Sequence, residues 1–341
     1  MSSLPLDALD SRPSVARRPR LAKRLLLLAC WAIVAPLATV ALLRVVAHDA
    51  AHPLILLDTF SLYLYLPAYA VLLVGLVLRR RALAGVAAAV VVAHISWNAP
   101  GALRASPLSP EAFSAPRLKI MSANLLMSNP DTDGIVGEAL AEDPDVLVLQ
   151  ELSAHWQAAF ESSDVGKRLP YHLAEARETP FGVGIYSRYP LEDAEIWYSW
   201  GDPVARATVR VGGRPVRLYD VHPLPPLHAE WVTNWSEALE GVRAEVEKER
   251  DRGAALVVAG DFNMTRHARW FERFTDLDLR DAHEDRGRGL AVSWPNGTLR
   301  LPPIRLDHVF LSPRIACLSV HEGRGRGSDH RPLVLDLAAL P

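Results

Sequence analysis

Two uncharged runs of nineteen residues constrain this fold most strongly, Leu25 to Leu43 and Phe60 to Leu78. A helix of that length spans about 28 Å, enough to cross the hydrocarbon core of a bilayer. A third apolar segment, Ala82 to Trp97, is shorter, so a buried or interfacial helix is an alternative to a span there. A cleaved signal peptide is an alternative for the first run, although that run is long and two more follow. The sequence predicts a membrane anchor at residues 25–97 with about three transmembrane helices (25–43, 60–78 and 82–97).

Lys and Arg residues flank these runs unevenly. Residues 1–24 form a basic tail, and Arg79-Arg80-Arg81 separates the second and third runs, whereas residues 44–59 contain a single Arg. Since basic flanks stay in the cytoplasm, we expect a multi-pass cell-membrane protein with a cytoplasmic N-terminus. The chain after Trp97 would then be extracytoplasmic. It begins with residues 98–116, where four prolines among Ala and Ser predict a Pro-rich linker.

The segment between the first two runs carries four ionisable side chains, His48, Asp49, His52 and Asp58. A hydrated loop between two spans is the simpler interpretation. A ligand or headgroup site is the alternative.

The remainder of the chain is acidic. Of the 37 Lys and Arg and 39 Asp and Glu residues, ten basic and four acidic ones fall in the first hundred positions, which leaves residues 101–341 with a charge of −8. A domain that grips nucleic acid usually shows a basic face or a high pI, so nucleic acid is the less favoured partner. Cys30 and Cys317 lie far apart in the sequence and imply no disulfide framework.

Short runs rich in β-branched residues recur after residue 116, and several alternate between apolar and polar side chains. The expected strands are Arg117–Asn124, Asp145–Leu149, Gly182–Ser187, Ala205–Val211, Val216–Val221, Ala255–Ala259, His308–Leu311 and Leu333–Leu337. Helices are expected after an Asp131 N-cap through Ala141, and from Ala229 to Arg252. This mixture favours two packed sheets covered by helices.

Four of the expected strands carry acid, amide or imidazole groups at one tip. The tips are Gln150-Glu151, Gly260-Asp261-Phe262-Asn263, Asp307-His308 and Ser328-Asp329-His330. Because each apolar strand delivers its polar tip to an edge of the scaffold, these groups predict an active site.

These tips resemble the motifs of the endonuclease/exonuclease/phosphatase superfamily, which is DNase I-like, over residues 117–338. Further matches are Ser122-Ala123-Asn124, the run from Gly182 to Pro190 (GVGIYSRYP), and Asp220-Val221-His222. The resemblance implies an α/β fold, a four-layered α/β sandwich of two packed sheets flanked by helices, in a catalytic domain at residues 117–341. It also implies phosphoester hydrolysis with Mg²⁺, or Mn²⁺, as cofactor.

The resemblance assigns a role to each motif residue. Ligands of a hard cation that polarises phosphoryl oxygens are expected to be Glu151, Asn124 and Asp329. His330 is expected to activate or orient the attacking water, with Asp307 fixing its tautomer.

Asp261 is expected to orient the nucleophile or hold a second metal ion, and Asn263 and His222 to bind phosphate oxygens. Arg206, on the strand before His222, is either a further substrate contact or an ordinary surface residue.

The substrate is predicted from the anchor and from one loop. After His222 comes Pro223-Leu-Pro-Pro-Leu227, a stiff apolar loop where nucleases often carry a polar segment that faces DNA. Three spans with an outward catalytic domain resemble the actinobacterial membrane proteins linked to teicoplanin and other glycopeptide resistance, which implies lipid-linked cell-wall pyrophosphates. The leading hypothesis is an extracytoplasmic phosphoesterase that acts on a membrane lipid such as a polyprenyl pyrophosphate. An extracellular nuclease and a catalytically lapsed binding domain are the alternatives.

Overall fold

The computed structural model describes residues 18–341 except 104, 298 and 299, so the predicted basic tail lies mostly outside the described residues. The chain divides into two compact units. One contains Met1–Leu42 and Tyr65–Ala93, and the other contains Leu43–Leu64 and His94–Pro341. The segment between the first two apolar runs therefore belongs to the same unit as the predicted catalytic domain.

The anchor region is helical. Among the described residues, α1 (Arg18–Val46) and α5 (Arg81–Leu103) contain stretches long and apolar enough to cross a membrane. The predicted second span is broken into α3 (Ser61–Leu64) and α4 (Pro67–Val77). With its eleven residues, α4 alone is only about 16 Å long. Helix α2 (His52–Thr59) and the following stretch Ser61–Val77 meet at an angle of 71°. They provide a third span only if the two bent pieces together form one broken span.

The region predicted as a linker is partly structured. Helix α5 continues to Leu103, and a short helix, α6 (Pro110–Ser114), follows. Between them the backbone N–H of Ser106 donates to the carbonyl of Asp285 at 2.8 Å. The connection therefore packs on the second unit instead of forming a free tether.

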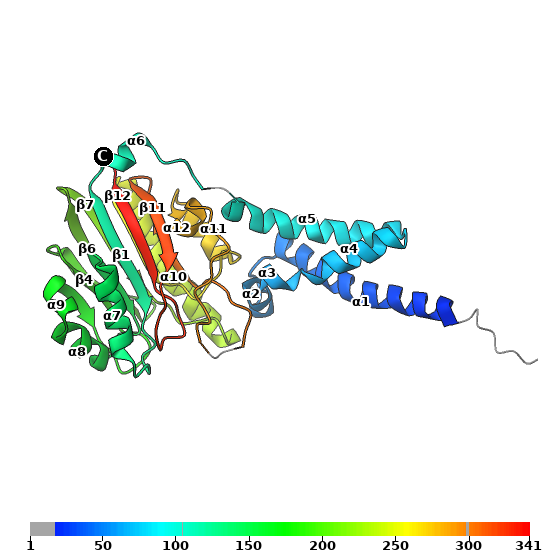
Figure 1. Ribbon diagram of the computed structural model, residues 1–341, viewed down its shortest axis with the longest axis horizontal. Coiled ribbons are helices and arrows are strands. Elements are labelled where there is room, and N and C mark those ends of the chain that lie inside the picture. The colour runs from blue at the N-terminus through cyan, green and yellow to red at the C-terminus, as the bar shows by residue number, and fades with distance from the viewer. Residues whose placement is uncertain (1–17, 104, 298–299) are drawn as a thin grey trace, which may run out of the picture. The chain divides into compact units, whose positions relative to one another are not determined.

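Two six-stranded sheets form the centre of the second unit (Figure 1). The first sheet contains, in spatial order, β11 (Ile315–Glu322), β12 (Leu333–Ala339), β1 (Arg117–Asn124), β2 (Val146–Gln150), β4 (Val183–Ser187) and β3 (Tyr171–Glu175). The second contains β5 (Glu192–Ser199), β6 (Asp202–Val211), β7 (Arg214–Val221), β8 (Ala255–Asp261), β10 (Asp307–Leu311) and β9 (Arg280–Asp281). All eight predicted strands are present. The four that were not predicted, β3, β5, β9 and β11, are the edge strands of the two sheets.

Apolar side chains separate the unit into four layers. Ile120 and Val148 of the first sheet share one buried cluster with Leu218 and Val257 of the second, so the inner faces pack on each other. The outer face of the first sheet is covered by α7 (Thr132–Glu142), α8 (Ala154–Ser162) and α9 (Asp164–Arg168). The outer face of the second is covered by α10 (Val232–Asp251) and α11 (Arg269–Thr275), while η1 (Ala229–Trp231) and α12 (Ala282–Asp285) are short connections. The predicted four-layered α/β sandwich is confirmed.

Strand register brings the polar tips to one edge. In the parallel pair β1 and β2, Asn124 lies opposite Gln150. In the antiparallel pair β8 and β10, Asp261 lies opposite Asp307. Gly260 permits the close approach of β7 to β8 beside them, because it has a φ of +142° and a Cβ atom would lie 2.1 Å from the carbonyl oxygen of Val221.

Candidate active site

Asn124 connects the tips of the two sheets. Its Nδ2 donates to Oε1 of Glu151 at 3.0 Å and to Oδ2 of Asp261 at 3.1 Å. Its Oδ1 accepts from the backbone N–H of Leu126 at 3.0 Å, which fixes the orientation of the amide. Asn124 therefore contacts Glu151, another of the expected ligands, and Asp261 of the other sheet.

Glu151 occupies a strained position. Its φ of +57° lies in the left-handed region, which costs a residue of this kind on the order of 1 kcal/mol. Oε2 accepts from the backbone N–H of Met127 at 2.9 Å, which helps to hold this geometry. Glu151 lines the cavity described below.

His330 and Asp307 form a buried pair. Nδ1 of His330 lies 2.8 Å from Oδ2 of Asp307, and Nε2 faces Oδ2 of Asp261 at 3.5 Å. Burial by itself lowers the pKa of His330, but the carboxylates of Asp307 and Asp261 outweigh it and raise the pKa to about 10. The imidazole is thus held in one orientation, with Nε2 directed at Asp261.

His222 and Asn263 complete the ring around Asp261. Nε2 of His222 lies 3.7 Å from Oδ2 of Asp261. Oδ1 of Asp261 accepts from the backbone N–H of Asn263 at 2.9 Å, and Nδ2 of Asn263 donates to the carbonyl of Pro223 at 3.0 Å. Nδ1 of His222 is buried and has no hydrogen-bond partner among the described residues.

Asp329 lies at the same edge but has different partners. Nε1 of Trp294 donates to its Oδ2 at 3.1 Å, while Oδ1 is buried with no partner in the described part of the chain. The neighbouring Ser328 donates from Oγ to the carbonyl of Asn124 at 2.8 Å. This contact ties the loop before β12 to the tip of β1.

The donor set suits a divalent cation. Ligand atoms of Asp261, Asp307 and His330 all lie within 4.8 Å of one another, and all three residues are buried. Glu151 and the unpartnered oxygen of Asp329 add further oxygen donors at this edge. Carboxylate oxygens are the preferred ligands of hard cations such as Mg²⁺. The structure thus groups Asp261 and Asp307 as candidate ligands beside the predicted set.

Arg206 is placed elsewhere. Its guanidinium pairs with Glu245 of α10 and with Glu195 of β5. These partners raise its pKa above the ordinary arginine value although burial acts against them. Arg206 does not line the cavity over the catalytic groups, and this placement favours the alternative of an ordinary residue outside the site.

A cavity of about 600 Å³ opens over the catalytic groups. Glu151, Asp261 and His330 line it on one side. The other lining is mostly apolar and comes from several places in the sequence. It contains Leu56, Thr59, Phe60, Pro180, Phe181, Leu224, Pro225, Pro226, Leu227, Trp231, Trp294, Leu301, Ile304 and Leu306. The motifs indicated the polar side, and the apolar loop after His222 indicated one part of the wall. The other apolar residues of the wall belong to no motif, so the sequence did not indicate them.

A buried bond joins the two sheets below the site. Nε2 of Gln150 donates to Oδ1 of Asp220 at 2.6 Å, and the N–H of Gly184 donates to Oδ2 at 2.9 Å. Burial raises the pKa of Asp220 to about 8. Both side chains lie within matched motifs, but their role is to fix one sheet against the other beneath the catalytic groups.

Comparison with known proteins agrees with this arrangement. The profile of the endonuclease/exonuclease/phosphatase family matches residues 121–330, which include every motif named above. The chain belongs to this family. It is therefore a metal-dependent phosphoric ester hydrolase, as enzymes of the family are.

Solved structures of the family share its fold at low identity. An endonuclease/exonuclease/phosphatase from Beutenbergia cavernae is 20% identical with a TM-score of 0.53, over 66% of this chain and 72% of that one. A family protein from Bacteroides vulgatus is 16% identical with a TM-score of 0.53, over 65% and 99%. A humanized TDP2 of D. rerio is 18% identical with a TM-score of 0.53, over 65% and 99%. No curated protein matches the chain.

Proposed function

We propose that this protein is a membrane-anchored, extracytoplasmic, Mg²⁺-dependent phosphoesterase that hydrolyses a phosphate linkage of a membrane lipid, with a polyprenyl pyrophosphate as first candidate. One observation carries the proposal: the catalytic groups line one side of a cavity whose remaining wall is mostly apolar. A substrate that fills it must present a charged phosphate and a hydrocarbon group side by side. Lipid phosphates have this composition, whereas nucleic acids carry charge along their whole backbone.

The residues divide the chemistry among them. A bound divalent cation would neutralise charge on the phosphoryl oxygens. His330, whose orientation is fixed by Asp307, orients the attacking water and acts as the acid–base group for the proton of that water. Asn263 and His222, which both line the cavity, supply N–H donors toward a phosphate.

The loop after β7 supports a lipid substrate. Leu224 and Leu227 alternate with prolines, and Leu227 is 60% exposed despite its apolar side chain. Proline restricts the loop before binding, so little conformational entropy is lost when it contacts a hydrocarbon surface. Trp231, at the end of η1, extends the same apolar wall.

The candidate spans supply the location. α1 and α5 would keep the enzyme at the bilayer, where a lipid substrate has a high effective concentration. With the bent stretch between them counted as a third span, the Lys and Arg bias supports an extracytoplasmic catalytic unit. A lipid carrier of the cell wall would be accessible there, and its turnover would link the enzyme to resistance against cell-wall antibiotics.

A substrate panel tests the proposal. Full-length protein in phospholipid nanodiscs with Mg²⁺ is given undecaprenyl pyrophosphate, sphingomyelin, ATP and plasmid DNA. We expect lipid turnover at least 10-fold above that of ATP or DNA, and loss of this activity in Glu151→Gln. Digestion of DNA with no release of phosphate or headgroup from any lipid would show that the protein is a nuclease. The absence of turnover with every substrate would show that it is a binding domain.

Two loop variants test the apolar wall separately. Leu224→Asp and Leu227→Asp should lower the ratio of lipid to ATP turnover, because a charge at the rim must be desolvated when the hydrocarbon binds. Phe113→Asp is the matched control, since Phe113 is 62% exposed on α6 and outside the cavity lining. An unchanged ratio in both loop variants would remove the loop from substrate binding.

A further inference from the structure

The segment Leu43–Leu64, which runs from the end of the first apolar run into the start of the second, is docked on the rest of the catalytic unit. It belongs to that unit as a compact body, and contacts from its two ends and its middle reach residues more than 170 positions away. A hydrated loop between two spans would leave its polar side chains in water. Polar side chains of this segment instead contact Leu227, Arg269 and Pro303 of the catalytic unit.

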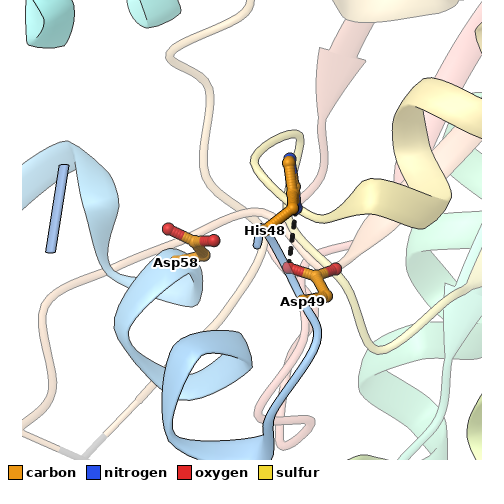
Figure 2. A group of neighbouring side chains, drawn as sticks. All are labelled: His48, Asp49 and Asp58. Atoms are coloured by element: carbon orange, nitrogen blue, oxygen red, sulfur yellow. Dashed lines mark hydrogen bonds and ion pairs between the residues drawn. The ribbon is translucent and has the colours of Figure 1, made fainter. Parts of the chain in front are cut away.

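The cluster of His48, Asp49 and Asp58 in this segment has its charges paired within the segment (Figure 2). Nδ1 of His48 lies 2.9 Å from Oδ1 of Asp49, and the dashed line in the figure marks this contact. Asp58 points toward the pair, but its Oδ1 lies 3.1 Å from Nη1 of Arg44. Arg44 also donates to Oγ of Ser61 at 2.9 Å. Since Nη1 of the buried Arg44 already pairs with Oδ1 of Asp58, the cluster is charge-balanced and serves as an attachment.

Its contacts reach across to the catalytic unit. Oδ2 of Asp49 accepts from the backbone N–H of Arg269 at 2.7 Å, at the first residue of α11. Nε2 of His48 lies 3.5 Å from Oε1 of Glu272, one turn further along that helix. Nη2 of Arg44 lies 3.4 Å from Nδ1 of His267, which is buried. Three side chains of the segment thus hold it to the start of α11.

A second set of contacts lies at the cavity. Nε2 of His52 lies 3.2 Å from the carbonyl oxygen of Leu227, the exposed end of the apolar loop. The hydroxyl of Tyr63 donates to the carbonyl of Pro303 at 2.6 Å, within the other loop that lines the cavity. The segment therefore bridges the two apolar loops on either side of the opening.

Between these attachments, α2 presents Leu56, Thr59 and then Phe60 to the cavity, the same one that Glu151 and His330 line. Leu56 is 37% exposed and Leu301, also in the lining, is 44% exposed. Exposed apolar side chains that gather around a cavity mark a binding surface. No polar group is supplied by Leu56 or Phe60, so what they contact must be apolar.

We propose that Leu56 and Phe60, both in the segment Leu43–Leu64, bind the hydrocarbon chain of the substrate beside the reacting phosphate and so determine its selection by chain length. The proposal deepens the proposed function and rests on it for the nature of the substrate. The catalytic domain at residues 117–341 would then hold the phosphate but only part of the hydrocarbon site. The rest of the hydrocarbon site would come from the anchor region, which lies earlier in the same chain.

Chain-length dependence of binding tests this assignment without requiring turnover. The probes are ethyl phosphate and hexyl phosphate, which differ by four methylenes and partition little into bilayers. Their dissociation constants are measured by titration calorimetry on full-length protein in nanodiscs with Mg²⁺. Full burial of a methylene strengthens binding about fourfold at most, so the hexyl ester should bind at least 10-fold more tightly even if burial is partial.

The variants are Leu56→Ala, Phe60→Ala and the double variant, with Phe113→Ala as matched control. We expect the ratio of the two dissociation constants to fall below about threefold in the double variant and to stay at wild-type level in the control. A wild-type ratio near one, or an undiminished ratio in a double variant that still binds ethyl phosphate, would overturn the proposal. If the double variant fails to fold, the single variants decide by the same ratio.

Failure of the proposed function gives a different result. Binding that depends on chain length, without turnover of any lipid, would refute the proposed lipid hydrolase but support the hydrocarbon site. Lipid turnover together with binding that does not depend on chain length would support the proposed hydrolase but refute the role of Leu56 and Phe60.

Discussion

Replacing His48 with Gln should remove a part of the stability that depends on pH. His48 lies between Asp49 and Glu272. Its hydrogen bond to Asp49 and the nearby carboxylate of Glu272 outweigh its burial and raise its pKa from 6.5 to about 9. The folded protein thus binds this proton more tightly than the unfolded chain. The resulting stabilisation is fully present below pH 6.5, decreases as the pH rises, and is lost as the pH passes 9.

The magnitude follows from the pKa and from exposure to solvent. A pKa that moves from 6.5 to about 9 corresponds to at most about 3.4 kcal/mol. The Glu272 side chain is 47% exposed, and Arg44 and Arg269 lie close to the same carboxylates, so screening and competition reduce the contribution to roughly 1–2 kcal/mol. For a unit of this size, that corresponds to roughly 2–8 °C in the midpoint of thermal unfolding.

The assay is thermal unfolding of full-length wild-type and His48→Gln protein in nanodiscs at pH 6, 7.5 and 9.5. The variant should unfold at a lower temperature at pH 6, and the difference should close by pH 9.5, where His48 is neutral in both states. His155→Gln is the matched control, because His155 is exposed on α8. A difference that is the same at every pH, or absent at pH 6, would refute the ion pair as the source of docking.

Four further predictions concern the site and the anchor. Glu151→Gln should lose most activity while it unfolds at the wild-type temperature, and chelation of divalent ions should have the same effect on wild type; near-normal turnover in either test would exclude Glu151 as a ligand. His330→Ala should reduce turnover by about 10²-fold or more, measured under saturating substrate, and a smaller loss would exclude it as the acid–base group. Gly260→Ala should destabilise the protein by about 2 kcal/mol or more in thermal unfolding, because its Cβ meets a carbonyl oxygen, whereas Gly137→Ala, which has open space in α7, should be neutral. A reporter active only in the cytoplasm, fused after Pro341, should stay silent, and full activity would reverse the orientation inferred from the basic flanks.

The sequence determined the central strands and the catalytic tips. The eight predicted strands are those with buried, largely apolar runs, such as VLVLQ at β2 and ALVVAGD at β8. Their pattern follows from burial on two faces, which a local window of sequence records. The edge strands β3 and β5 were missed because their exposed and half-exposed residues leave a weak pattern.

The tertiary structure alone decided which groups meet. Asp261 lies between Asn124, His222 and His330, and these come from two sheets that stack only after folding. It also assigned Arg206 to two glutamates, since a strand position does not reveal which helix covers it.

The docking of Leu43–Leu64 shows the same limit of the sequence most clearly. Its ionisable residues predicted either a hydrated loop or a ligand site. Instead, His48 and Asp49 contact α11 more than 200 residues away, His52 contacts Leu227, and Asp58 pairs with Arg44. Contacts at such separation leave no periodic trace in either partner, because each side chain needs only one position that faces the other. The local pattern therefore defined the strands and the polar tips, and only the packing of distant segments defined the cavity above them.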